Sequence, residues 1–359
     1  MKIGIVTIVD YTNYGNRLQN FALYQTLKKM GHDAITLHPI SDKKYENGNH
    51  ILWMKNLIAR ELCIFPEFAE KRFGSGMTRW ANFMRWTKRI PTKDIYETER
   101  LDDSLNQEFD YFFVGSDQVW NPLIVKDQIY NFFLEFAEDS KKVAVSASIG
   151  MDELPEECKN RYTEQLCKFK YISVRENAGA KILEELLCKE VPVIIDPTMM
   201  LTAEEWIQNE RKPRVNITKP YVLKYYLGDK EGDRIDKWAK ENGCQVYELM
   251  NPDVPELYSA GPGEFLSLIR HAKLVCSDSF HCIVFSILFY TPFLVYERKG
   301  TENYMTSRLD TLLETFELQD RWESLVNEEE LLNIDYSKTE MILRDQRKIF
   351  MSYISSFLH

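Results

Sequence analysis

The sequence predicts an α/β protein built from two doubly wound, Rossmann-like domains that face each other across a cleft. Short apolar runs such as residues 3–9 lack polar alternation and are followed by helical segments, which is typical of parallel strands covered on both faces. This rhythm stops at the polar segment 209–220, which contains two prolines, and then starts again. We therefore predict two domains joined by a linker at 209–220.

The first predicted domain, residues 1–208, opens with a βαβ unit. A strand over 3–9 leads into a turn rich in Asn and Gly, and a helix is expected over 17–30 because Leu23, Leu27 and Met30 share one face. Later elements follow from apolar runs and helical periodicity. Strands are expected over 34–37, 111–114, 142–146, 171–174 and 193–195, and helices over 156–168 and 177–189.

Residues 41–100 interrupt this pattern, and we predict a helical insertion there. Between residues 51 and 90 there are eight Lys or Arg and three Asp or Glu, interleaved with aromatic residues. Two interpretations stay open. The segment packs as ordinary helices whose basic side chains snorkel to solvent. Alternatively it forms a binding platform that contacts a membrane surface through Lys71, Arg72, Arg79 and Arg85.

The second predicted domain, residues 221–336, repeats the alternation of strand and helix. Strands are expected over 221–226, 245–249, 272–276 and within 287–296, and helices over 230–242, 264–271, the apolar run after 280, and 306–316. An amphipathic helix over 338–358 follows. We expect the segment 337–359 to pack back on the first domain.

Composition limits the function classes. The chain has 359 residues and a net charge of -10, so no global charge recruits nucleic acid. The seven cysteines show no zinc-ligand spacing, so we expect reduced thiols, a cytoplasmic protein and no metal site. The apolar start is too short for a signal peptide, and the longest apolar run, 282–296, contains Pro292, so no membrane span is expected.

The segment around His281 is the strongest functional signal from the residues alone. An apolar run ends at Cys276, a polar turn follows, and His281 falls in the first turn of an apolar helix. Ligands bind at the carboxyl edge of open parallel sheets, and helix N-termini attract phosphate. His281 is therefore a candidate proton-transfer residue; the alternative is a hydrogen-bonded histidine that only packs.

An ordered set of motifs resembles the polysaccharide pyruvyl transferase family. The motifs run from Asn13-Tyr-Gly-Asn16 through Val114-Gly-Ser-Asp-Gln-Val-Trp-Asn121 and Ser146-Ala-Ser-Ile-Gly150 to Ser173-Val-Arg-Glu176. They continue with Asp196-Pro-Thr198, Ser277-Asp-Ser-Phe-His281 and Ser307-Arg-Leu-Asp310. The resemblance implies a fold similar to two-domain GT-B glycosyltransferases. It also implies transfer of pyruvyl from phosphoenolpyruvate to sugar hydroxyls, as a ketal, with no cofactor. Ser279 stands where many members carry arginine.

This chemistry requires cations for the two anionic groups of the donor. Arg175 follows a predicted strand and is the candidate bidentate clamp, unless it pairs with Glu176 or another neighbour. Arg308 and Arg17 are candidate replacements for the missing arginine, with a solvated helix charge as the alternative for Arg308. Ser277, Ser279 and nearby backbone amides are further candidate phosphate ligands.

Other candidates lie at predicted strand ends. Asp117 is the candidate base for the acceptor hydroxyl, or else an N-cap, and Ser116 beside it is a candidate substrate contact. Trp120 either stacks on a sugar or belongs to the core. Asn13 and Asn16 either bind ligand or form a tight turn. We interpret the Asp-Pro-Thr turn at 196–198 as structural.

The predicted function is transfer of pyruvyl to a saccharide acceptor in surface polysaccharide synthesis. Two alternatives stay open. One is a glycosyltransferase that uses a nucleotide sugar, and the other is a non-catalytic saccharide-binding protein. Partners are therefore phosphoenolpyruvate and a saccharide acceptor, without nucleic acid. If residues 51–90 form a platform at the inner membrane surface, the acceptor there is a lipid-linked glycan.

Overall fold

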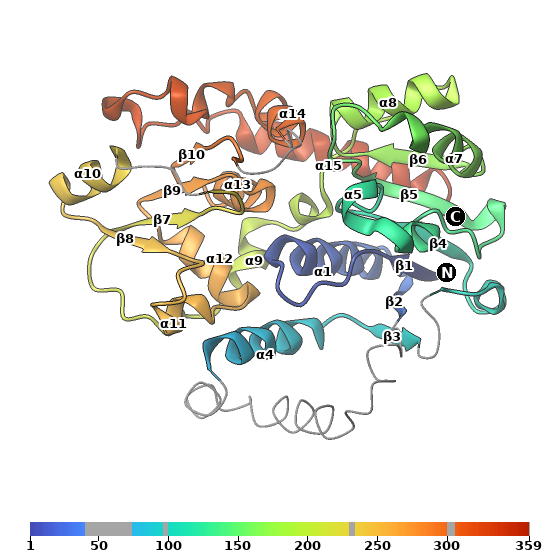
Figure 1. The fold of residues 1–359 in the computed structure, drawn as a ribbon, viewed down its shortest axis with the longest axis horizontal. Helices are drawn as coiled ribbons and strands as arrows, with labels where there is room; N and C mark the ends of the chain where they lie inside the picture. Colours follow the sequence, from blue (N-terminus) through green and yellow to red (C-terminus); the bar gives the residue numbers. More distant parts are fainter. Residues whose placement is uncertain (40–73, 96–99, 230–233, 300–305, 359) are drawn as a thin grey trace.

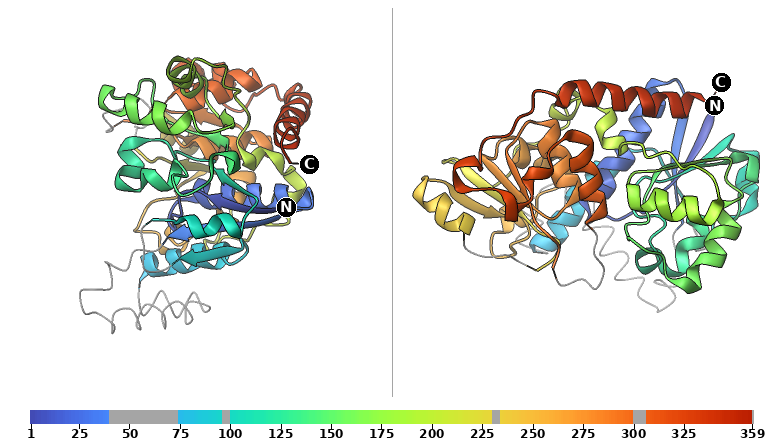
Figure 2. Two further views of the ribbon diagram at one scale, coloured as in Figure 1. Left: turned by 90° about the vertical axis from the view of Figure 1, so that its right-hand side faces the viewer. Right: turned by 90° about the horizontal axis from the view of Figure 1, so that it is seen from above.

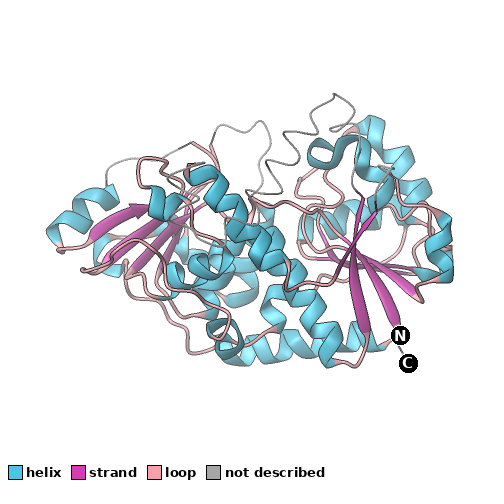
Figure 3. Ribbon diagram, turned by 90° about the horizontal axis from the view of Figure 1, so that it is seen from below, coloured by secondary structure: helices cyan, strands magenta, loops and turns pink. Residues whose placement is uncertain are grey.

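A computed structural model describes residues 1–39, 74–95, 100–229, 234–299 and 306–358. The described residues form two separate parallel sheets, each flanked by helices (Figure 1). Seen from below, the strands form two groups with helices around and between them (Figure 3). The predicted fold class is confirmed.

The first sheet has the strand order β3-β2-β1-β4-β5-β6, with every neighbouring pair parallel. Strand β5, which lies between β4 and β6, is buried at every position, as expected for a strand covered on both faces. The strands are β1 Lys2–Val6, β2 Asp33–Pro39, β3 Thr92–Ile95, β4 Tyr111–Val114, β5 Lys142–Ala147 and β6 Tyr171–Val174.

Helix α1 (Tyr14–Lys29) connects β1 to β2 and begins where the sequence predicts turn chemistry. Asn13 is its N-cap, and the Asn13 side chain accepts a hydrogen bond from the backbone N–H of Asn16. The other α-helices of this half are α4 Ser75–Thr87, α5 Pro122–Val125, α6 Ile129–Phe132, α7 Glu156–Leu166, α8 Asn177–Leu187 and α9 Ala203–Ile207. Short 3₁₀ helices are η2 Asp103–Gln107, η3 Lys126–Gln128, η4 Asp139–Lys141 and η5 Pro197–Met200.

The second sheet has the order β10-β9-β7-β8 and is also parallel. Its strands are β7 Tyr221–Tyr225, β8 Gln245–Glu248, β9 Leu274–Ser277 and β10 Phe293–Val295. Its helices are α10 Arg234–Glu241, α11 Pro255–Tyr258, α12 Pro262–Arg270, α13 Phe280–Leu288 and α14 Ser307–Phe316, followed by η6 Gln319–Arg321, η7 Glu323–Leu325 and η8 Glu328–Glu330.

The last helix, α15 (Thr339–Ser355), returns from the second half to the first sheet, and both chain ends lie on the same side (Figure 2). The Tyr353 hydroxyl donates to the Ala144 carbonyl at 2.7 Å. The ring of Phe357 packs on Tyr171 and Phe113. The C-terminal segment therefore fastens the second half of the chain to the strands of the first.

Buried polar contacts also join the two halves near the start of α1. The Tyr14 hydroxyl donates to the Ala260 carbonyl at 2.9 Å and accepts from Arg79 Nη1 at 2.6 Å. Arg79 also donates to the Tyr258 carbonyl. Helices α1 and α4 are thus tied to the segment between α11 and α12.

Three predictions about elements need correction or fall outside the described residues. Residues 92–95, within the predicted helical insertion, form the edge strand β3, because they pair in parallel with β2. Residues 193–195 form no strand; Val193 makes a single bridge to Val174 before the chain turns into η5. Of the inserted segment itself, residues 40–73 and 96–99 are not described.

Candidate functional site

Asp196 lies at the centre of a buried polar cluster. Its Oδ2 accepts hydrogen bonds from Ser116 Oγ at 2.7 Å and Arg175 Nη1 at 2.8 Å, and it lies 3.5 Å from Nε2 of His281. Its Oδ1 accepts from the backbone N–H and hydroxyl of Thr198, at 3.0 and 2.7 Å. The Asp-Pro-Thr turn therefore fixes a carboxylate between the two sheets.

Strand ends of the first sheet supply the neighbours of Asp196. Ser116 and Asp117 follow β4, and Arg175 follows β6, so all three lie at the carboxyl edge where ligands bind in open parallel sheets. Gly115, the first residue after β4, has φ +110°, and a Cβ at this position would lie 2.4 Å from the Val145 carbonyl oxygen. Only glycine fits this close approach of two strands.

Arg175 is committed to carboxylates of the protein. Its Nη1 donates to Asp196, its Nη2 lies 3.3 Å from Oδ1 of Asp117, and its Nε lies 3.9 Å from Oε2 of Glu176. The guanidinium carbon lies 4.6 Å from the centre of the Phe280 ring. The prediction that Arg175 clamps the substrate in bidentate fashion needs correction, because Nη1 and Nη2 already face Asp196 and Asp117, although Nε has no hydrogen-bond partner among the described residues.

The charges of this cluster keep both aspartates ionised. Burial alone would raise the pKa of Asp117, but the charges of Arg175 and His281 and a hydrogen bond from Asn16 hold that pKa below its usual value. Burial likewise acts to raise the pKa of Asp196, and His281 and Arg175 together hold it far below its usual range. A carboxylate with a depressed pKa is a weak base, so the role of general base predicted for Asp117 is disfavoured.

His281 is buried but not hydrogen-bonded at Nε2. It lies in the first turn of α13, as predicted, and 7 % of the residue is exposed. Among the described residues, Nε2 has no hydrogen-bond partner and faces Asp196. The opposite nitrogen lies against the backbone of α1: a Cβ built on Gly15 would meet Nδ1 at 1.9 Å. The alternative of a fully hydrogen-bonded packing histidine does not describe this ring.

Two further arginines are buried without a carboxylate partner in the described part of the chain. Arg17 donates to Asn16 Oδ1 and the Ile8 carbonyl, but its Nη1 has no partner. Nε of Arg308 also has none. Burial lowers the pKa of Arg17 to about 10. Burial and the charges of Arg175 and Arg298 lower the pKa of Arg308 to about 9, so the alternative of a solvated helix charge is wrong.

The comparison with family models decides the identification. Residues 13–300 match the model named polysaccharide pyruvyl transferase. The chain belongs to the polysaccharide pyruvyl transferase family. It is therefore a transferase, and the resemblance seen in its motifs is confirmed.

Solved structures with similar chains include two UDP-GlcNAc 2-epimerases. The enzyme from Neisseria meningitidis, bound to UDP-GlcNAc, is 13% identical, with 99% of this chain and 100% of that chain covered and a TM-score of 0.48. The enzyme from Methanocaldococcus jannaschii, in complex with UDP-GlcNAc and UDP, is 13% identical, with 96% and 99% covered and a TM-score of 0.45. A search of curated proteins gives no match.

Several predicted ligand contacts of this pyruvyl transferase family member are structural instead. Asn13 is the exposed N-cap of α1. The Asn16 side chain donates to the Ile8 carbonyl and to Asp117, and its oxygen accepts from the Asp10 amide and from Arg17. The tight-turn alternative therefore holds for both. The Ser277 hydroxyl donates to the Tyr225 carbonyl and accepts from the Ser279 amide, so neither group is available to a phosphate.

Trp120 and Arg79 also need correction. Trp120 is fully buried and donates from Nε1 to the Phe132 carbonyl, so it belongs to the core and cannot stack on a sugar. Asp117 does not cap the following helix, because Asn121 caps α5. Arg79 is buried and tied to Tyr14, so it is unavailable to a membrane. Lys71 and Arg72 lie outside the described residues.

Sequence reasoning missed Asp196 as a site residue. The sequence did contain a signal for Asp196. This residue directly follows the apolar run 193–195 and precedes a proline, a pattern typical of the polar residue that follows a buried segment. Glu176 was considered only as a partner for Arg175. Its Oε1 accepts from the amides of Ile149 and Gly150, and its Oε2 has no hydrogen-bond partner among the described residues.

Within the described residues, no group of three or more His, Cys, Asp or Glu side chains is placed to hold a metal ion. In the same part of the chain, none of the helices has both the length and the apolar character needed to cross a membrane.

Proposed function

We propose that this protein transfers the pyruvyl group of phosphoenolpyruvate to hydroxyls of a saccharide during surface polysaccharide synthesis. One observation carries the proposal. Arg17 and Arg308 are buried guanidinium groups, and each has a nitrogen without a hydrogen-bond partner among the described residues. Burial lowers the pKa of each, and the charge of Asp117 opposes that shift. Buried cations without a partner are costly, and a doubly anionic ligand such as phosphoenolpyruvate would satisfy them.

His281 is the proposed proton-transfer residue. As the imidazolium, it gives a proton to the methylene carbon of the donor while the acceptor oxygen bonds to the adjacent carbon. The hydroxyl proton of the acceptor then returns the ring to its charged form. In the second step another sugar hydroxyl bonds to the same carbon, the carbon–oxygen bond to phosphate breaks, and phosphate leaves with the second proton. A positioned acid and base of this kind typically contributes ~10²–10⁴-fold.

Asp196 and Asp117 have an electrostatic and orienting role in this proposal. Both are held as anions by Arg175 and His281, which makes proton abstraction by either unfavourable. Asp196 holds the Nε2 edge of the ring at 3.5 Å, and Gly15 leaves room for the Nδ1 edge. The imidazole ring of His281 therefore lies between the Asp196 carboxylate and the backbone of α1 at Gly15. Nε2 faces Asp196, and Nδ1 is on the opposite edge of the ring.

Titration calorimetry with phosphoenolpyruvate and with a panel of nucleotides tests the proposal. We expect phosphoenolpyruvate to bind and His281→Ala to lower turnover by ~10²–10⁴-fold while donor binding and the melting temperature change little. Binding of nucleotides without phosphoenolpyruvate would favour a nucleotide-sugar glycosyltransferase instead. Binding of neither would favour a non-catalytic saccharide-binding protein. Wild-type-like turnover by His281→Ala would remove this histidine from the mechanism.

A further inference from the structure

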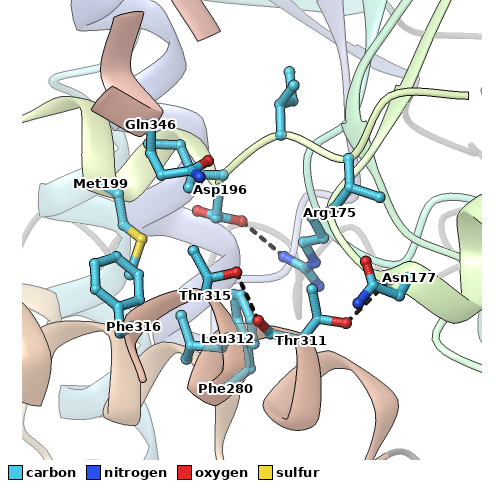
Figure 4. Close-up of a pocket in the computed structure, with 13 residues that line it drawn as sticks. Arg175, Asn177, Asp196, Met199, Phe280, Thr311, Leu312, Thr315, Phe316 and Gln346 are labelled. Carbon is cyan, nitrogen blue, oxygen red and sulfur yellow. Dashed lines mark hydrogen bonds and ion pairs between the residues drawn. The ribbon is translucent and has the colours of Figure 1, made fainter. Parts of the chain in front are cut away.

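A cavity of about 150 Å³ lies beside the ion pair of Arg175 and Asp196 (Figure 4). It is enclosed by the strand ends of the first sheet, by α14 and η5, and by Gln346 of α15. Arg175 and Asp196 are buried at its inner end, whereas Asn177 is exposed and Thr315 and Gln346 are partly exposed. The cavity therefore reaches from the centre of the candidate site to a polar rim.

We propose that this cavity binds a single neutral pyranose ring, the sugar of the acceptor that receives the pyruvyl group. The inference rests on the proposed function and deepens it, because it assigns the acceptor a place and a charge. An engineered cavity of 150 Å³ in another protein accepts benzene, so this volume suits one six-membered ring and not an oligosaccharide.

The charges around the cavity favour a neutral ligand. Arg175 is the arginine that lines it, and that guanidinium is already balanced by Asp196 at 2.8 Å and Asp117 at 3.3 Å. Arg17 and Arg308, which have no carboxylate partner among the described residues, do not line the cavity, and neither does His281. An anion in the cavity would meet Asp196 without an unpaired cation to offset it. The doubly anionic donor therefore belongs with Arg17 and Arg308 and not in the cavity.

The lining matches the two kinds of surface that a sugar presents. Phe280, Phe316 and Met199 offer apolar contacts for the carbon-bound hydrogens of a pyranose face. Thr315, Asn177 and Gln346 offer hydroxyl and amide groups for its hydroxyls. The Thr315 hydroxyl donates to the Thr311 carbonyl, which leaves its oxygen lone pairs available to accept from a ligand. A few polar groups among apolar walls are typical of small-ligand sites.

The Arg175–Asp196 pair would then separate two subsites. Phe280 contacts both sides, because its ring lies in the cavity wall and its edge-on neighbour is His281, with ring centres 5.2 Å apart. An acceptor hydroxyl at the end of the cavity beside Asp196 would reach the ion pair from within the cavity. This arrangement brings the two substrates together at the residues that fix the histidine ring.

Thr315→Phe tests the assignment by filling the cavity, and Met341→Phe is its control. Met341 lies in α15, is exposed and is not part of the lining. Binding of methyl glucoside, methyl galactoside and methyl mannoside is measured by saturation-transfer NMR, and phosphoenolpyruvate binding by calorimetry. Gln346→Ala is a second, milder variant, and the thermal unfolding of each variant reports on its fold.

We expect at least one methyl glycoside to bind the wild type and the Met341→Phe variant, and Thr315→Phe to weaken that binding by about tenfold or more. Phosphoenolpyruvate affinity should stay unchanged in all variants. Glycoside binding that survives Thr315→Phe, or a panel in which no glycoside binds the wild type, would overturn the inference. Loss of phosphoenolpyruvate binding in Thr315→Phe would overturn it too, by placing the donor in the cavity. If the wild type binds a glycoside at this cavity but not phosphoenolpyruvate, the proposed function fails and the sugar site stands.

Discussion

Gly15→Ala is the sharpest test of how the histidine is positioned, because it changes no chemical group of the site. The new Cβ would lie 1.9 Å from Nδ1, 2.4 Å from Cγ and 2.6 Å from Cε1 of His281. Ordinary contacts are no shorter than about 3.0 Å, so the ring or α1 must shift by roughly 1 Å. A misplacement of about 1 Å can cost ~10²-fold in rate. We therefore expect turnover to fall about a hundredfold, or ~2.7 kcal/mol in the barrier.

The loss should come from geometry and not from unfolding. Alanine favours a helix over glycine by ~1 kcal/mol, so a loss of stability in α1 is not expected to explain it. Gly76→Ala is the matched control: Gly76 lies in α4, and a Cβ there meets nothing within 4 Å. That variant should keep full activity.

The assay is phosphate release from phosphoenolpyruvate in the presence of a saccharide acceptor found in the glycoside screen. Because Gly15 acts through His281, the double variant Gly15→Ala/His281→Ala should be no slower than His281→Ala alone. Turnover by Gly15→Ala within about twofold of wild type would refute the reasoning, since a change that small corresponds to only ~0.4 kcal/mol. Additive losses in the double variant would show that Gly15 matters for another reason.

Three further changes probe the charges and the contact between the halves. Arg308→Leu should weaken phosphoenolpyruvate binding roughly 10- to 100-fold in calorimetry, the loss of a hydrogen bond to a charged group. The same change should raise the free energy of unfolding at pH 7, because it removes a buried charge. Burial lowers the pKa of Arg308 from 12.5 to about 9. The destabilisation by this charge is therefore fully present below pH 9 and fades as the pH rises toward 12.5. Asp196→Asn should destabilise the protein by about 3–5 kcal/mol in urea unfolding at pH 7, because it leaves Arg175 short of its closest carboxylate. The pKa of Asp196 is lower in the folded state than in the unfolded state, so its carboxylate stabilises the fold above the unfolded pKa of about 3.9. The difference in free energy of unfolding between wild type and Asp196→Asn should therefore shrink as the pH falls below that value. Tyr14→Phe removes the bonds to Ala260 and Arg79 and should cost about 1–3 kcal/mol in the same assay; no loss would mean that this contact contributes nothing.

The sequence predicted the sheet strands well because their signal is local. Runs such as 111–114 and 171–174 are apolar and bounded by turn residues, and both appear as strands with those bounds. The edge strand β3 was missed because Thr92–Ile95 is polar and only partly buried, as an edge strand can be. Residues 193–195 look like a strand, but they pair only through Val193, since the chain turns into η5 directly afterwards.

The sequence predicted several residues of the candidate site but not the ion pairs that they form. His281, Arg175 and Asp117 were placed at strand or helix ends by local pattern, and the structure brings all three to Asp196 or to each other. Which carboxylate each cation faces depends on side chains from residues 117, 175, 196 and 281, far apart in the chain. No local pattern encodes that pairing. The pairing determines that Arg175 balances charge within the protein, and it leaves Arg308 without a carboxylate partner in the part of the chain that the structure describes.

Ser279→Arg offers the last test, because Ser279 stands where many family members carry arginine. If Arg308 supplies the missing positive charge from α14, an arginine restored at the start of α13 should recover phosphoenolpyruvate binding in the Arg308→Leu background. In the wild-type background the same change adds a like charge to a cluster in which Arg175 and Arg298 already lower the pKa of Arg308, so it should reduce stability without donor. The measurements are calorimetric affinity and thermal unfolding with and without phosphoenolpyruvate. Failure of Ser279→Arg to recover binding in a folded double variant would mean that Arg308 does not stand in for the family arginine, and that Arg17 alone carries the compensating charge.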